Sequence, residues 1–79
     1  DDSAFEIVLA GADPDDLTFR QARAMGSADT VVHEPEVPDA ILDRARADAP
    51  RVRIEKGGAA PALPGFTVVM RFPARDANR

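Results

Sequence analysis

Three short groups of residues in this sequence carry side chains that could do chemistry. The first is Asp13-Pro14-Asp15-Asp16, which places three carboxylates within four residues. Mg²⁺ and Ca²⁺ bind clustered oxygen ligands of this kind. Acids directly ahead of a helix also stabilise its positive N-terminal end. The second interpretation is the more common one, so we predict a helix approach here and no metal site.

The second group is His33, Glu34 and Glu36, which invites a metal or general-base interpretation. Zinc sites use three or four convergent ligands, and the chain has no cysteine and one histidine. A base also needs a nucleophile at a recognisable spacing, and Ser27 has no such frame. We therefore predict a solvated loop histidine and no catalytic residue.

The third group is Lys56-Gly57-Gly58, which has some features of a phosphate-binding loop. It lacks the preceding Gly-x-x-x-x frame and a following Ser or Thr. The wider segment 56–65 contains three Gly, two Pro and three Ala. This composition is typical of a flexible connector, which is the interpretation we favour.

The first half of the chain has the pattern strand, loop, helix, strand. Residues 5–10 are apolar except for Glu6, which predicts a strand covered on both faces. Thr18 and Gln21 form a capping-box pair at the start of a helix that ends near Gly26. A second β-branched run ends at residue 32. In parallel sheets ligands bind at the carboxyl ends of strands, so loop 11–17 is the first place to expect a site.

The second half adds one helix and two strands. Pro38 should open the helix and Pro50 should stop it. Its predicted inward positions are Ile41, Leu42, Ala45 and Ala49. Residues 51–55 alternate charged and apolar side chains, which predicts a strand near a sheet edge. Residues 66–72 form the most β-prone segment, and residues 73–79 should be a flexible tail.

These elements predict one α/β domain over residues 1–79. Its order is β-α-β-α-β-β, with a small, mostly parallel, Rossmann-like sheet and two covering helices. The link before the last strand is short for a crossover, which favours a last strand antiparallel to the third. Ile7, Val31 and Val69 should point inward on adjacent strands, with Ile41 or Leu42 covering them.

Two alternatives stay open for residues 66–72. Five of these seven residues are apolar, and two helices cannot cover both faces of about four strands. The segment could therefore be an exposed strand through which the domain forms a homo-oligomer or docks on a partner domain. Alternatively, it occupies the centre of the sheet and needs no partner.

Composition excludes several classes of protein. The chain has 79 residues, 44% of them hydrophobic, and a net charge of -4. Scattered basic residues in an acidic chain argue against a nucleic-acid partner. No apolar run approaches the roughly 18 residues that span a membrane, and the first residues are unlike a signal peptide. We therefore expect a cytoplasmic protein with no membrane partner.

Several motifs resemble the start of the tetrapyrrole methylase family, which includes uroporphyrinogen-III C-methyltransferases and siroheme synthases. That family has a strand, a glycine-rich loop containing Asp-Pro and Leu-Thr, a helix ending in Ala-Asp, and a Val-Val strand. The matching pairs here are Asp13-Pro14, Leu17-Thr18, Ala28-Asp29 and Val31-Val32. With further matches between Ile41 and Lys56, the resemblance covers about residues 5–56, the first subdomain of the family.

The chain also departs from the family pattern. Of the three loop glycines only Gly11 remains, and the cofactor-binding Gly-Gly-Asp-Pro is replaced by Pro73-Ala74-Arg75-Asp76. The resemblance implies S-adenosylmethionine as the family cofactor and Gly11, Asp13 and Pro14 as the residues at the matching loop positions. The lost glycines remove close backbone approach, so we expect no cofactor for this chain alone.

The resemblance leaves two hypotheses for function. The first is a reduced, non-catalytic module that serves siroheme or tetrapyrrole biosynthesis through association or structural support. The alternative is a fragment of an active S-adenosylmethionine-dependent uroporphyrinogen-III C-methyltransferase whose remaining parts are absent. In either case we do not expect the chain alone to be an enzyme.

Overall fold

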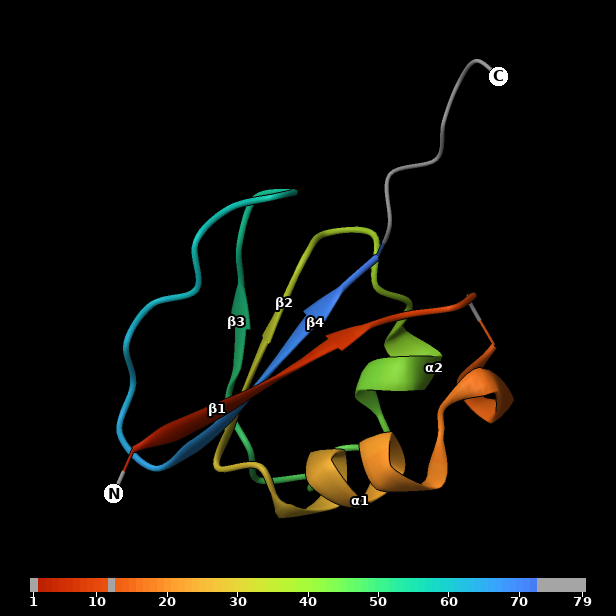
Figure 1. Cartoon of the computed structure of the whole chain (residues 1–79), viewed down its shortest axis with the longest axis horizontal. Coiled ribbons are helices and arrows are strands. Elements are labelled where there is room, and N and C mark those ends of the chain that lie inside the picture. Colours follow the sequence, from red (N-terminus) through yellow and green to blue (C-terminus); the bar gives the residue numbers. More distant parts are fainter. Residues whose placement is uncertain (1, 12, 73–79) are drawn as a thin grey trace.

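The computed structural model describes residues 2–11 and 13–72, and its elements follow the predicted order (Figure 1). The strands are β1 (Ser3–Val8), β2 (Thr30–His33), β3 (Arg51–Arg53) and β4 (Phe66–Arg71). The helices are the 3₁₀ turn η1 (Pro14–Asp16), α1 (Phe19–Ser27) and α2 (Asp39–Leu42). The predicted tail, residues 73–79, lies outside the described part of the chain.

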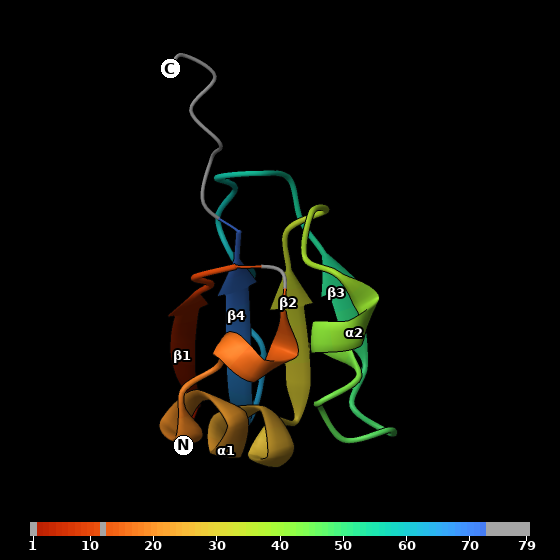
Figure 2. The ribbon, with the colours of Figure 1, turned by 90° about the vertical axis from the view of Figure 1, so that its right-hand side faces the viewer.

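The four strands form one sheet in the order β1-β4-β2-β3, and every neighbouring pair is parallel. Figure 2 shows η1, α1 and α2 together on one face of this sheet. The predicted fold class, a small α/β domain with a Rossmann-like parallel sheet, is therefore confirmed. The prediction that β4 runs antiparallel to β3 is wrong, because β4 lies between β1 and β2 and is parallel to both.

The connector from β3 to β4 makes this parallel return without a helix. It crosses the face opposite the helices, from the carboxyl end of the sheet to its amino end (Figures 1 and 2). A dozen extended residues reach about 40 Å, whereas a six-residue strand is only about 20 Å long. The strands are so short that a connector of this length is sufficient.

Both predicted helices form, with different lengths. The Thr18 hydroxyl accepts a bond from Gln21 N at 3.0 Å and Gln21 Oε1 accepts from Thr18 N at 3.0 Å, so the capping box is confirmed. The second helix ends at Leu42, although Ala45 and Ala49 are buried as predicted. Tight turns replace its last part, because the Pro50 carbonyl must reach Val31 N at the sheet.

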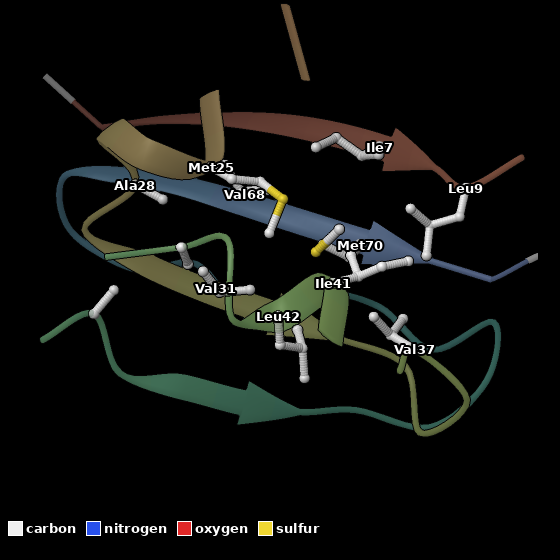
Figure 3. Close-up of a cluster of buried hydrophobic side chains, with 12 residues drawn as sticks. Ile7, Leu9, Met25, Ala28, Val31, Val37, Ile41, Leu42, Val68 and Met70 are labelled. Carbon is white, nitrogen blue, oxygen red and sulfur yellow. The ribbon is translucent and has the colours of Figure 1, made fainter. Parts of the chain in front are cut away.

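The core lies between the sheet and the helices (Figure 3). The register pairs Ile7 with Met70 and Val31 with Val68, so these side chains share the helix face. Val69 is buried, but it faces the connector on the opposite side of the sheet. The prediction that Val69 shares a face with Ile7 and Val31 is therefore wrong by one residue of strand alternation.

The two edges of the sheet differ from one another. β3 is at one edge, as predicted. β1 is at the other edge, and Val8 is 57% exposed, so the expectation that this strand is covered on both faces is wrong.

Residues 66–72 have two alternatives from the sequence: an exposed contact strand for oligomers or partners, or a strand in the centre of the sheet. The structure places β4 in the centre of the sheet, with Thr67 and Val69 buried on the connector side and Val68 and Met70 buried on the helix side. The idea of an exposed strand is therefore wrong, and the central alternative is confirmed.

Truncation of Leu42 tests the helix covering. Leu42 is buried under the sheet, and removing a buried leucine side chain typically costs about 2 to 5 kcal/mol. We expect Leu42→Ala to lower the free energy of unfolding by such an amount in urea titrations followed by circular dichroism. Val8→Ala, at an exposed position, is the control and should change it little. An unchanged midpoint for Leu42→Ala would mean that α2 does not seal the core.

Candidate functional site: the carboxyl edge of the sheet

The predicted loop site follows β1 at the carboxyl edge. Asp13 caps η1, because its Oδ1 accepts from Asp15 N at 3.0 Å, and Pro14 is the first residue of that turn. A Cβ on Gly11 would lie 2.8 Å from Asp16 Oδ2, so a side chain there would crowd this carboxylate. The Asp13 carboxylate is thus engaged by its own turn. Cofactor binding by Gly11, Asp13 and Pro14 stays a prediction.

The second group, residues 33–36, separates in space. His33 is the last residue of β2 and is half-buried, so the prediction of a solvated loop histidine is wrong. Its Nδ1 lies 3.1 Å from the Glu34 carbonyl oxygen. The Glu34 carboxylate binds Arg71 and backbone amides, while Glu36 binds Lys56. Among residues 2–11 and 13–72, no three His, Cys, Asp or Glu side chains are grouped so that they could hold a metal ion.

Glu34 is the centre of the carboxyl edge, a role that sequence reasoning missed. Its side chain is 3% exposed. Oε1 accepts from Phe72 N at 2.9 Å, and Oε2 accepts from Gly57 N at 2.8 Å and from Arg71 Nη1 at 3.0 Å. Arg71 Nε also donates to Glu6 Oε2 at 2.6 Å. One carboxylate therefore joins the ends of β2 and β4 to the start of the connector.

Lys56 completes this arrangement. Its Nζ donates to the Phe72 carbonyl at 2.6 Å and to Glu36 Oε1 at 2.7 Å. Gly57 follows with φ of 73°, a left-handed conformation that favours glycine. The segment that resembled a phosphate loop thus holds the end of β4. We call Glu6, Glu34, Glu36, Lys56 and Arg71 the carboxyl-edge cluster.

The charges in this cluster stabilise one another. Burial raises the pKa of Glu34, but hydrogen bonds from Gly57 N, Phe72 N and Arg71 outweigh it and lower this pKa below its ordinary value. Hydrogen bonds to Glu34 and Glu6 raise the pKa of Arg71 above its usual range. Glu34 therefore stays ionised as a structural anion, whereas a general base would need a pKa nearer neutrality.

The cluster stands where a parallel sheet ordinarily binds its ligand. Clefts at such sites open outside the carboxyl ends of the strands. Here the carboxyl ends of β2 and β4 are instead tied to the connector by Glu34 and Lys56. The sequence signal for this arrangement is weak, because Glu34 and Arg71 are far apart in the chain and nothing in the sequence around either residue marks it as a partner of the other.

A shallow groove lies away from this cluster, near the amino ends of β1 and β4, and has a volume of about 330 Å³. Residues 2–4 form one side, and connector residues 60–63 form the other, with Thr67 and Val69 also lining it. The Thr67 hydroxyl is buried and has no hydrogen-bond partner among the described residues. None of the sequence-predicted site residues lines this groove.

None of the described helices is both long enough and apolar enough to cross a membrane.

Comparison with known proteins gives one consistent result. The chain is 45% identical over 62 residues to the siroheme synthase of Stutzerimonas stutzeri (strain A1501) and 47% identical over 62 residues to that of Pseudomonas fluorescens (strain Pf0-1). The siroheme synthase of Nitrosomonas europaea is 48% identical over 54 residues. No family model and no solved structure matches.

The matches cover most of this chain and little of the relatives. In the first two comparisons the aligned part is 75% of this chain and 13% of the siroheme synthase. In the third it is 65% of this chain and 11% of the relative. The resemblance noted in the sequence is therefore confirmed: this chain is similar to one segment of the siroheme synthases.

Proposed function

We propose that the chain is a non-catalytic module of siroheme biosynthesis, derived from a tetrapyrrole methylase and acting through association or structural support. The relatives named siroheme synthase support the connection to this pathway. The carboxyl-edge cluster supports the non-catalytic role, and it is the observation on which the proposal chiefly depends.

The carboxyl-edge cluster disfavours cofactor binding because Glu34 already occupies the hydrogen-bond donors at this edge. A ligand that used the donors at the carboxyl ends of β2 and β4 would have to displace the buried Glu34 carboxylate from Phe72 N, Gly57 N and Arg71. Each buried donor left without an acceptor costs about 1 to 3 kcal/mol. Those costs would offset much of the free energy that a small ligand gains on binding.

The first test is titration with S-adenosylmethionine. We expect no saturable heat when this cofactor is titrated into the chain, because the thinned Gly11 loop and the closed carboxyl edge offer it few backbone donors. A methyltransferase of known affinity, titrated with the same cofactor solution, checks the ligand. A dissociation constant below about 10 μM, near -7 kcal/mol, would contradict the proposal.

The alternative is that the chain is part of an active S-adenosylmethionine-dependent uroporphyrinogen-III C-methyltransferase. The short coverage of the relatives, 13% of their length, favours it. In that case Gly11, Asp13 and Pro14 would contribute to a cofactor loop completed by other parts of the polypeptide.

An assay on the native polypeptide separates the two functions. Two forms of the native polypeptide are compared, one with the segment that corresponds to this chain and one without it. Each form is incubated with uroporphyrinogen III and methyl-labelled S-adenosylmethionine. Label transfer that depends on the segment supports the methyltransferase. The module predicts no label transfer, together with a lower cellular siroheme content when the segment is deleted from the gene.

A further inference from the structure

The connector between β3 and β4 covers the second face of the sheet without belonging to the core. It lies on the face opposite the helices (Figures 1 and 2). Beneath it are the buried side chains of Val32, Thr67 and Val69. None of residues 54–65 is part of the hydrophobic cluster between the sheet and the helices. The sheet therefore has a thin second layer that can move while the main core stays folded.

The middle of the connector is held weakly. Residues 59–64 have the sequence Ala-Ala-Pro-Ala-Leu-Pro, and they form no hydrogen bond with any other described residue. Leu63 is the one large aliphatic side chain among these six residues, and it is only half-buried. Segments with few backbone hydrogen bonds and little buried apolar surface have low local stability. This stretch can therefore leave the sheet at low cost in free energy.

Both ends of the connector are fixed, and each fixed end adjoins a glycine. At the β3 end, Ile54 N donates to the last carbonyl of β2 at 2.9 Å. At the β4 end, Phe66 N donates to Asp29 Oδ2 at 2.9 Å. Gly57, with φ of 73°, and Gly65, with φ of 81°, lie just inside these anchors. Glycine changes backbone region without a Cβ clash, so the stretch between the two glycines can swing as one unit.

The carboxyl-edge cluster holds the connector in its closed position. Gly57 N donates to Glu34 Oε2 at 2.8 Å. Lys56 Nζ donates to the Phe72 carbonyl at 2.6 Å, and its side chain is 35% exposed, so water can replace this partner. When the connector opens, the Glu34 carboxylate keeps its bonds from Phe72 N and Arg71. Opening therefore leaves no buried charge unpaired, which would be the most costly consequence.

We propose that the connector is a latched cover. Residues 57–65 swing away from the sheet about Gly57 and Gly65 while the helix-side core stays folded, and the Lys56 bonds control how often they do so. Opening uncovers Val32 and Val69 on the second face of the sheet. This inference goes beyond the proposed function and does not depend on it, because the contacts named above lie within this chain in either case.

The test uses cysteine as a reporter, because the sequence contains none. Val31 and Val32 are neighbours on β2 and are both fully buried, the first under the helices and the second under the connector. Cysteine behaves as a small apolar residue and suits both positions. Connector opening should expose the thiol of Val32→Cys, whereas that of Val31→Cys needs unfolding of the core. Iodoacetamide, followed by mass spectrometry, should label Val32→Cys at least about tenfold faster.

Urea and the latch provide two further measurements. Local opening exposes little surface, so labelling of Val32→Cys should depend weakly on urea, while labelling of Val31→Cys should rise steeply. Adding Lys56→Met should increase the ratio of the two rates at least about threefold. Arg44→Met is the matched control, because it removes an exposed ion pair with Asp15 on the helix side. This control should leave the ratio unchanged.

Three results would overturn the proposal. A rate ratio below about tenfold, or an equal dependence on urea, would mean that the connector leaves the sheet only when the whole domain unfolds. A ratio that Lys56→Met leaves unchanged would mean that Lys56 is no latch. If either cysteine variant loses its native circular dichroism, Val69→Cys and Val68→Cys replace the pair, since they lie on the same two faces of β4.

Discussion

Replacing Glu34 with alanine is expected to lower the free energy of unfolding by about 3 to 5 kcal/mol, the usual cost of breaking a buried ion pair from one side. The substitution leaves Phe72 N and Gly57 N without their acceptor and removes one of the two carboxylates bound to Arg71. The total free energy of unfolding of a small domain is only about 5 to 15 kcal/mol. Urea titration followed by circular dichroism should therefore show a much earlier midpoint.

Glu36→Ala is the matched control for this prediction. Glu36 also accepts from a lysine of the cluster, but its side chain is 59% exposed, and exposed pairs contribute at most about 1 kcal/mol. The free energy of unfolding of Glu34→Gln should lie between those of the two alanine variants, because glutamine keeps the shape of the side chain and one acceptor oxygen. Equal midpoints for Glu34→Ala and Glu36→Ala would contradict the central role of Glu34.

The same carboxylate should make stability depend on pH. The folded-state pKa of Glu34 is lowered, so its contribution is complete above the ordinary glutamate pKa and is lost as pH falls through the folded value. The difference in stability between the parent and Glu34→Gln should therefore be full down to about pH 5 and shrink between about pH 5 and about pH 3. A constant difference over this range would mean that Glu34 is not the titrating group.

The elements that the sequence predicted well depend on local rules. The capping box at Thr18 and Gln21 lies within four residues, so the start of α1 can be read directly. The alternation of residues 51–55 likewise predicts an edge strand, which the structure confines to Arg51–Arg53. The inward face of α2 also follows from its apolar spacing, even though turns replace its last part.

The features that sequence reasoning missed depend on contacts between distant residues. β4 is apolar at both Val68 and Val69, so its alternation does not show which side chain faces the helices. Only the register with β1 and β2 decides this. The candidate site is equally hard to predict from the sequence. Glu34 contacts Arg71 only because the connector returns β4 to the middle of the sheet, next to β2.

Placing lysine at both Val68 and Met70 should abolish folding. Both side chains are fully buried on the helix face of the central strand. An unpaired ammonium group in an apolar core carries a desolvation cost of several kcal/mol, and two together exceed the stability of most small domains. We expect the double variant to lose its cooperative urea transition and its native circular dichroism.

Val8→Lys is the control, because it introduces lysine on an apolar strand residue that is 57% exposed. It should unfold close to the parent, with a change within about 0.5 kcal/mol. The comparison between the double variant and Val8→Lys tests the central position of β4 as well as the burial of Val68 and Met70. If strand 66–72 were an exposed contact surface, the double variant would remain folded and sediment as a monomer. That result would contradict the strand order β1-β4-β2-β3, since a central strand buried on both faces cannot accommodate two lysines.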